Sequence, residues 1–238
     1  MKKTATSSGF RREGFTLIEL LIVIVVMAIL ATMLVPTINK IIQSTDIRRS
    51  QAFVLRVANA AAHFKGQNNG RYPGQDDIGQ LAGTKPQAGP YTGSQIAAAR
   101  LFGYPDIQIK GAGSNAPQAT SKYLDYKSHL LIGKNSKGVN IPKNSLGDNS
   151  GTTNALLYFP SRLNATTPTA CYMWEDNSAY VTEDNASAKS RFENDCAKDP
   201  HGGNFARNAG GILIIGTGAN DKYLETTDND DITSWDID

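Results

Sequence analysis

The chain has 238 residues with 24 basic and 22 acidic side chains, and its formal net charge of +2 is spread unevenly. The first fourteen residues hold four Lys or Arg against one Glu, whereas the remaining residues carry 20 basic and 21 acidic groups. A nucleic-acid-binding protein carries its basic surface on the folded domain, so this distribution argues against that class, and we predict no nucleic-acid partner. The basic start is typical of a membrane orientation signal.

A long apolar run follows the basic start. Residues 15–35 contain a single charged side chain, that of Glu19. As a helix this run extends for about 30 Å, the thickness of the hydrocarbon core of a bilayer. A secretory signal peptide has a shorter apolar region, of about 7–15 residues, and ends in an A-x-A-like site. The run therefore predicts a single-pass transmembrane helix, with the basic start in the cytoplasm and the chain after Pro36 outside.

The helical pattern continues beyond the apolar run. Apolar residues recur at intervals of three and four, the spacing of an amphipathic helix: Ile38, Ile41, Ile42, Phe53, Val57, Ala60, Ala61 and Phe64. We predict one helix of about fifty residues, apolar all round in its first half and on one stripe in its second. Pro36 is expected to kink this helix without breaking it, and Asn68-Asn69-Gly70 to end it.

The chain becomes rich in Gly, Ser, Asn and Pro from residue 75 to about 150, and we expect order in only part of it. Residues 95–102 have a helical pattern, and residues 123–132 fit a helix or a strand. Three apolar segments predict strands: residues 155–159, 170–174 and 211–215. The predicted fold class is α+β: a long N-terminal helix, transmembrane in its first half, packed on a small antiparallel sheet.

The two cysteines are Cys171 and Cys196, with 24 residues between them. An even pair in a chain exported from the cytosol favours a disulfide, and the alternative is two unpaired buried thiols. In the chain-entropy model a disulfide closing a loop of this size stabilises the fold by about 3 kcal/mol.

The stretch Arg11-Arg12-Glu13-Gly14-Phe15-Thr16-Leu17-Ile18-Glu19 resembles the cleavage and methylation signature of type IV prepilins and type II secretion pseudopilins. The resemblance implies that a prepilin peptidase cuts between Gly14 and Phe15 on the cytoplasmic side and N-methylates Phe15. It also implies four segments: a leader (1–14), a transmembrane and polymerisation helix (15–35), its amphipathic continuation (36–66) and a periplasmic or extracellular globular domain (67–238).

Glu19 is the most informative residue of the apolar run. An unpaired carboxylate inside a membrane helix costs a few kcal/mol. One interpretation is that Glu19 lies close enough to the interface to reach water. The other, which the family supports, is a salt bridge to the free α-amino group of a neighbouring subunit's Phe15. Cleavage must then precede assembly, because that amine does not exist until the bond after Gly14 is cut.

The C-terminal segment is acidic, with seven acidic residues among the last eighteen against one basic residue. Carboxylates on a Gly/Asn/Thr loop suit calcium, although the spacing is not that of an EF-hand; a solvated acidic tail is the alternative. The segment resembles the C-terminal calcium loop of major pseudopilins, with Ile232 and Trp235 as apolar anchors. By position, that resemblance implies that the leading carboxylate ligands are Asp228 and Asp231. Asp230 or Asp221 is a further carboxylate ligand, and the weaker oxygen ligands are Thr226 and the carbonyl of Leu224.

No catalytic constellation is present in the sequence, and we predict that the chain is not an enzyme. The leading hypothesis is a pseudopilin of the bacterial inner membrane, extracted by an assembly platform into a pseudopilus with copies of itself or other pilin-like subunits to drive protein secretion. A minor or major type IV pilin of a surface pilus is the alternative, because a long insertion (75–210) and the cysteine pair depart from the major-pseudopilin pattern. A single-span, membrane-anchored periplasmic protein is a further alternative.

Overall fold

The computed structural model describes residues 15–76, 91–102, 123–124, 131–135, 137–148, 154–181, 185–201, 203–218, 222–225 and 231–235. The predicted leader therefore lies outside the described residues. Contacts divide the chain into two units, Met1–Gln43 and Ser44–Asp238, and each is described by itself. The four predicted segment boundaries stay predictions.

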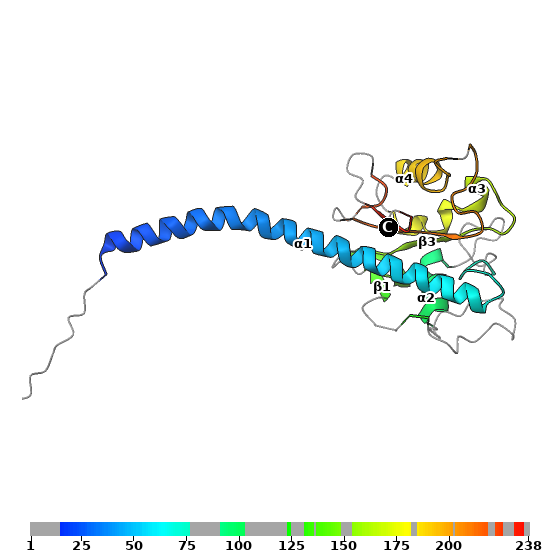
Figure 1. Cartoon of the computed structure of the whole chain (residues 1–238), viewed down its shortest axis with the longest axis horizontal. Helices are drawn as coiled ribbons and strands as arrows, with labels where there is room; N and C mark the ends of the chain where they lie inside the picture. Colours follow the sequence, from blue (N-terminus) through cyan, green and yellow to red (C-terminus); the bar gives the residue numbers. More distant parts are fainter. Residues whose placement is uncertain are drawn as a thin grey trace, which may run out of the picture. The chain divides into compact units, whose positions relative to one another are not determined.

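Helix α1 (Leu17–Gln67) is a single helix of 51 residues, which confirms the predicted length (Figure 1). Pro36 lies inside it without ending it. In the first unit every described side chain is exposed, including the whole apolar run. By length and composition this part of α1 is able to cross a membrane.

The end of α1 has the outer hydrogen bond of a Schellman motif. The Gly70 N–H donates to the Lys65 carbonyl at 3.1 Å, and Asn69 adopts a left-handed φ of 52°. The Asn68 side chain donates to the Phe64 carbonyl at 2.8 Å and satisfies a second terminal acceptor. The predicted helix end is confirmed.

The second unit contains a three-stranded antiparallel sheet in the order β3-β4-β5. Its strands are β3 (Leu157–Pro160), β4 (Ile212–Gly216) and β5 (Ile232–Thr233). Leu157 pairs with Ile215, and Ile215 pairs in turn with Thr233. The predicted strands at 155–159 and 211–215 are confirmed to within two residues, and the α+β, pilin-like class is confirmed with them.

A separate hairpin and a short helix complete the middle of the chain. The hairpin pairs β1 (Leu131–Lys134) with β2 (Asn140–Leu146), and α2 (Gly93–Phe102) confirms the helix predicted at 95–102. Of the ambiguous segment 123–132, the last two residues begin β1, Tyr123 and Leu124 form a bend, and residues 125–130 lie outside the described residues.

The strand predicted at 170–174 is wrong. This stretch forms the end of α3 (Pro168–Cys171), an extended link and the start of the 3₁₀ helix η3 (Trp174–Asp176). Pro168 occupies the first turn of α3, where its fixed φ and missing N–H favour a helix start. The side chains are apolar because they cover the sheet: Cys171, Tyr172 and Trp174 are buried.

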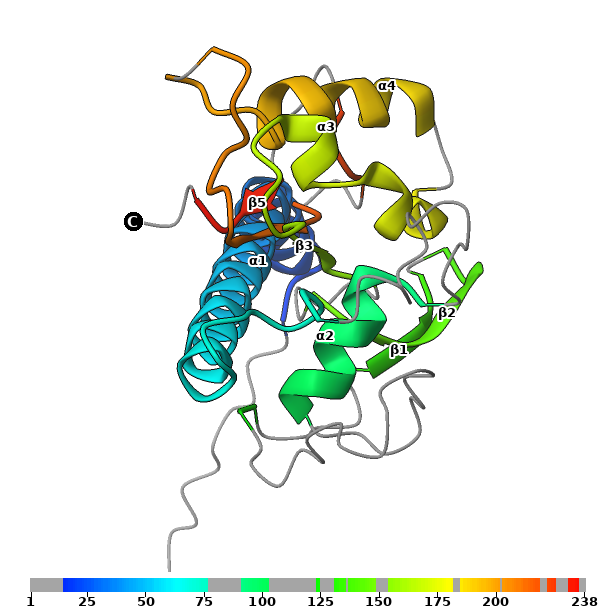
Figure 2. The same cartoon turned by 90° about the vertical axis from the view of Figure 1, so that its right-hand side faces the viewer.

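Both faces of the sheet are covered, so its strands are apolar throughout instead of alternating. On one face Tyr158 and Ile214 pack with α1 and α2 in a cluster that also contains Phe53 and Val57, the inner core. On the other face Phe159 and the other alternate strand residues pack under η3, η4 (Ser178–Tyr180), α4 (Asn185–Arg191) and the π-helical turn η5 (Phe192–Cys196), the outer core. Figure 2 shows the two coverings on opposite sides of β3.

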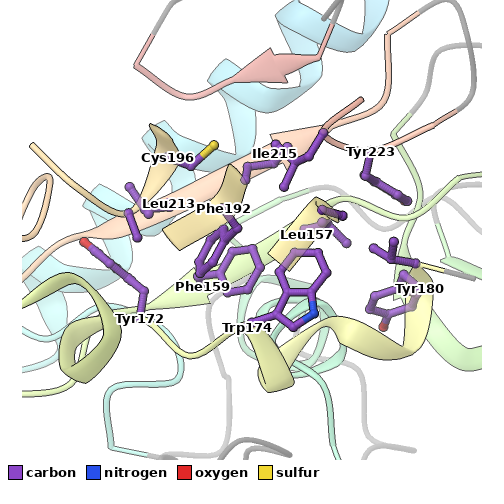
Figure 3. Packing of buried hydrophobic residues seen from close by; sticks show 14 of the residues in the cluster. Leu157, Phe159, Tyr172, Trp174, Tyr180, Phe192, Cys196, Leu213, Ile215 and Tyr223 are labelled. Atoms are coloured by element: carbon purple, nitrogen blue, oxygen red, sulfur yellow. The ribbon is translucent and has the colours of Figure 1, made fainter. Parts of the chain in front are cut away.

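The outer core is built around three aromatic rings (Figure 3). The Phe159 and Phe192 rings lie 4.3 Å apart, and Trp174 lies 5.5 Å from Phe192. The Trp174 indole N–H donates to the Asn185 side chain at 2.9 Å, so its polar atom is satisfied. The segment between β3 and β4 is therefore a folded layer with its own aromatic packing.

The start of α2 is locked against β3. Gln95 and Thr92 cap the helix reciprocally, with the Thr92 N–H donating to Gln95 Oε1 at 3.0 Å. Gly93 lies so close to β3 that a Cβ built on it falls 1.8 Å from the Tyr158 carbonyl oxygen. Only glycine permits this approach.

Candidate functional site

The N-terminal motif forms a capping box at the start of α1. The Thr16 N–H and hydroxyl donate to Glu19 Oε2 at 2.8 and 2.7 Å. The Glu19 N–H donates back to Thr16 Oγ1 at 3.3 Å. Two of the orphan donors of the first helical turn are thus satisfied by side chains. The spacing Thr-x-x-Glu was present in the sequence, and the prediction missed it because Glu19 was considered only as a charge in the membrane.

The capping box uses one oxygen of the carboxylate. Both hydrogen bonds from Thr16 reach Oε2, and among the residues that the structure describes no hydrogen bond reaches Glu19 Oε1. Phe15 directly precedes the cap and is exposed. Within the described residues one carboxylate oxygen thus caps the helix, and the other accepts no hydrogen bond.

Pro36 lies within the exposed half of α1. Because proline has no N–H, the carbonyl of Thr32 lacks its helical donor. The hydroxyls of Thr32 and Thr37 are bonded back to the helix carbonyls of Ile29 and Met33, at 2.7 and 3.3 Å. These polar side chains thus leave the apolar surface of α1 continuous, and a role of Pro36 in assembly stays a prediction.

Two of the six predicted calcium ligands are described, and they come together. The Leu224 N–H donates to Asp231 Oδ2 at 2.8 Å, and Leu224 has a left-handed φ of 54°. The other four, Asp221, Thr226, Asp228 and Asp230, lie outside the described residues. Within the described ranges no group of three or more His, Cys, Asp or Glu side chains is arranged to hold a metal. The hydrogen bond closes the base of the predicted loop, and calcium itself stays a proposal.

The base of that loop is held on both sides. Before it, the Tyr223 hydroxyl donates to the Ala155 carbonyl. After it, Ser234 exchanges two hydrogen bonds with Ile214, at 3.0 and 3.2 Å. Both predicted apolar anchors pack on the domain: Ile232 belongs to the inner core, and Trp235 packs against the outer core.

Arg207 makes a cation–π contact with the ring of Trp235, which follows the loop. Its guanidinium lies 4.8 Å from the ring centroid. The same side chain donates to the carbonyls of Cys196 and Asp195 at 3.0 and 3.1 Å, at the end of η5. The covering layer thus supports the C-terminal segment.

Both cysteines are buried in the outer core and have free thiols in the structure. Burial raises the pKa of the Cys171 thiol. Burial, assisted by the nearby carboxylates of Asp231 and Asp195, raises the pKa of Cys196 to about 12. The structure contains no Cys171–Cys196 bond, and the disulfide stays a prediction.

Comparisons with known proteins match part of the chain. The family described as the prokaryotic N-terminal methylation motif matches residues 9–35. The chain is 32% identical over 83 residues to Type II secretion system core protein G of Pectobacterium carotovorum subsp. carotovorum, across 35% of this chain and 53% of that protein. It is 34% identical over 80 residues to the protein of the same name from Aeromonas hydrophila, across 34% of this chain and 55% of that protein.

The chain thus spans about half the length of the curated relatives it matches. No solved structure matches it. The methylation motif contains Gly14, Phe15 and Glu19, so the match and the two relatives support the resemblance to pilin-like proteins and pseudopilins. With the apolar first half of α1 they also support a membrane-anchored protein.

Proposed function

We propose that this chain is a pseudopilin, a structural subunit of a type II secretion pseudopilus without enzymatic activity. The observation that carries the proposal is the methylation motif at residues 9–35, whose apolar run forms the exposed first half of α1. Its similarity to two proteins named core protein G favours a pseudopilus over a surface pilus.

In this proposal a prepilin peptidase cuts the chain between Gly14 and Phe15 and methylates the new amino group. The subunit is then held in the bacterial inner membrane by the first half of α1, with its globular domain in the periplasm. An assembly platform draws it into a filament with copies of itself or other pilin-like subunits. The growing filament drives protein secretion.

The apolar half of α1 suits both environments. Its side chains are exposed all round and carry one charge between residues 15 and 35. Moving this surface from lipid to a bundle of similar helices exchanges one apolar surrounding for another, so the apolar transfer cost is small.

Glu19 supplies the specific contact in this exchange. Its Oε2 caps α1, and its Oε1 accepts the ammonium group of a neighbouring subunit's Phe15. An ion pair in a low-dielectric surrounding is strong when both partners are present and heavily penalised when one is missing. The pair therefore sets the axial register of the filament.

Calcium and a disulfide complete the proposed subunit. One Ca²⁺ is bound by Asp228 and Asp231, with Asp230 or Asp221, the Thr226 hydroxyl and the Leu224 carbonyl as further oxygen ligands. The contact between Leu224 and Asp231 supports this site, because it brings its two described members together. In the periplasm Cys171 and Cys196 pair across the outer core.

The deciding experiment is mass spectrometry of the mature protein from cells that express the full chain with a prepilin peptidase. The expected product begins at an N-methylated Phe15. A Gly14→Glu variant is the matched control and should keep its leader, because a side chain replaces the glycine at the scissile bond. An intact Met1 in the wild type, or a cut beyond Ala31, contradicts the proposal and favours a plain membrane anchor or a signal peptide.

A further inference from the structure

The part of α1 in the second unit has two unlike faces. One face enters the inner core through residues such as Phe53, Val57 and Phe64. The opposite face is exposed, and its members recur at three- and four-residue intervals: Arg48, Arg49, Ala52, Leu55, Arg56, Asn59, Ala62 and His63. We call Arg48, Arg49 and Arg56 on this side the arginine face.

Within the described residues of its own subunit, the arginine face makes one exposed ion pair, that of Arg49. In the part of the chain that the structure describes, Arg48 and Arg56 make no ion pair or hydrogen bond. Arg49 reaches Asp46 of the same helix at 3.5 Å, with its side chain 62% exposed. An exposed pair of this kind contributes little to stability. Arg48 and Arg56 lie about 12 Å apart along the helix, which makes a positive strip two turns long.

The complementary charge lies at the other end of the chain. Residues 221–238, the acidic segment, contain seven acidic residues against Lys222. Within the described residues of this segment, β5 packs its Ile232 in the inner core, among the buried side chains of α1. The described end of this segment thus packs on the face of α1 opposite the arginine face.

We propose that the arginine face of one subunit binds the acidic segment of a second copy of this chain. Two different, complementary surfaces on one chain make a heterologous contact, and such contacts generate open helical polymers when the rotation does not close. Complementary charge also steers association and fixes register. The proposal rests on the proposed function, and it adds an electrostatic contact between globular domains to the Glu19 pair in the apolar helices.

The test uses the full chain assembled by its own secretion machinery, with the fraction of subunit in sheared filaments as the readout. The variant Arg48→Glu/Arg56→Glu should lower that fraction about tenfold or more, because it places like charges together. Arg48→Lys/Arg56→Lys is the matched control and should stay within about twofold, because it keeps the positive charge. Thermal unfolding of the charge-reversed variant should match the wild type, because both side chains are exposed.

The acidic partner is tested by a second charge reversal. Asp236 and Asp238 are not predicted calcium ligands, so Asp236→Lys/Asp238→Lys leaves the predicted ion site intact. Alone it should lower filament incorporation, and combined with Arg48→Glu/Arg56→Glu it should restore at least a third of the wild-type fraction, as roughly expected for swapped charge pairs.

Three outcomes overturn the proposal. One is normal assembly of Arg48→Glu/Arg56→Glu. Another is failure of both reversed variants without mutual rescue, which removes the acidic segment as the partner. The third is loss of the charge-reversed subunit from the membrane before assembly, which assigns the arginines to anionic lipid headgroups. Failure of the proposed function is seen in the wild type instead: a chain that is processed normally but enters no filament contradicts it, whatever the arginine variants do.

Discussion

Thr16 and Glu19 satisfy each other's polar groups at the first turn of α1: the threonine hydroxyl donates to Glu19 Oε2 at 2.7 Å, and the Glu19 N–H donates to the hydroxyl oxygen at 3.3 Å. The carboxylate proposed to join two subunits is therefore already oriented by its own subunit. Orientation before association reduces the entropy lost when the contact forms.

The first prediction concerns the cap. Thr16→Ala should weaken the first turn of α1 by about 1 kcal/mol, which corresponds to roughly fivefold lower filament incorporation. Thr16→Ser keeps the hydroxyl and should assemble like the wild type. Hydrogen exchange at the amides of residues 17–20, in detergent micelles, reports the loss of the cap directly. Equal exchange in the alanine and serine variants contradicts the capping role.

The second prediction separates the charge of Glu19 from its cap. Gln suits the third position of a capping box as Glu does, but its amide is neutral. Glu19→Gln should therefore insert normally and keep the helix start, yet lower filament incorporation about thirtyfold or more, because a buried ion pair loses one partner. Glu19→Ala should insert and fail to assemble. If Glu19→Gln forms filaments at the wild-type level, the carboxylate acts only as a cap.

The N-terminal half of the fold was predictable because its signals are local. The apolar run, the amphipathic spacing and the Asn68-Asn69-Gly70 stop are consecutive in sequence, and α1 follows them. The strands β3 and β4 were found for the same reason. Sequence could not show what covers their second face, since a strand buried on both sides is uniformly apolar whatever lies over it.

The elements that were missed lack such signals. Strand β2 contains Pro142 and a left-handed Asn144, with φ of 63°, and has no apolar run. Strand β5 has two residues and depends on pairing with β4. In the candidate site, the pairing of Leu224 with Asp231 spans seven residues and is closed by the tertiary fold. Contacts that depend on the tertiary fold in this way leave no periodic pattern in the chain.

The third prediction tests the close approach of α2 to β3. Gly93→Ala places a Cβ 1.8 Å from the Tyr158 carbonyl oxygen, so the helix start must move. We expect a loss of about 3 kcal/mol or more in the free energy of unfolding, measured in urea. The matched control is Gly66→Ala in α1, where a Cβ meets nothing within 4 Å. It should stabilise the helix by about 0.5–1 kcal/mol. Similar urea midpoints for the two variants contradict the structure at Gly93.

The fourth prediction concerns alkaline pH and the thiols. The pKa of Cys196 rises from 9.0 to about 12 on folding, so between these values the unfolded thiol ionises while the folded thiol stays protonated. The contribution of this thiol to the free energy of unfolding is fully present below pH 9. Between pH 9 and 12 it falls by about 1.4 kcal/mol per pH unit. Burial also raises the pKa of Tyr180, to about 12, and adds to the loss above pH 10.

The slope of stability against pH from 9 to 12 measures this effect in reduced protein. Cys196→Ala should show a shallower slope, with the tyrosine contribution remaining. Protein oxidised in the periplasm should show a slope at least as shallow as that of the alanine variant, because neither Cys171 nor Cys196 titrates in a disulfide. Its thiols should be absent from alkylation assays in denaturant. Two reactive thiols in the denatured periplasmic protein contradict the predicted disulfide. Equal slopes for reduced wild type and Cys196→Ala contradict the burial of the thiol.

The fifth prediction distinguishes the ion from the loop that would hold it. At saturating Ca²⁺, binding should raise the melting temperature of the full chain by about 5 °C or more over its value in EGTA. Asp228→Ala should remove this increment and leave the EGTA value unchanged. Asp231→Ala should remove the increment and also lower the EGTA value, because the part-buried Leu224 N–H loses its acceptor at a cost of about 1–3 kcal/mol. Equal melting temperatures of the wild type in Ca²⁺ and in EGTA contradict the proposed calcium site. If Asp231→Ala then still has a lower melting temperature in EGTA than the wild type, Asp231 closes the loop without an ion.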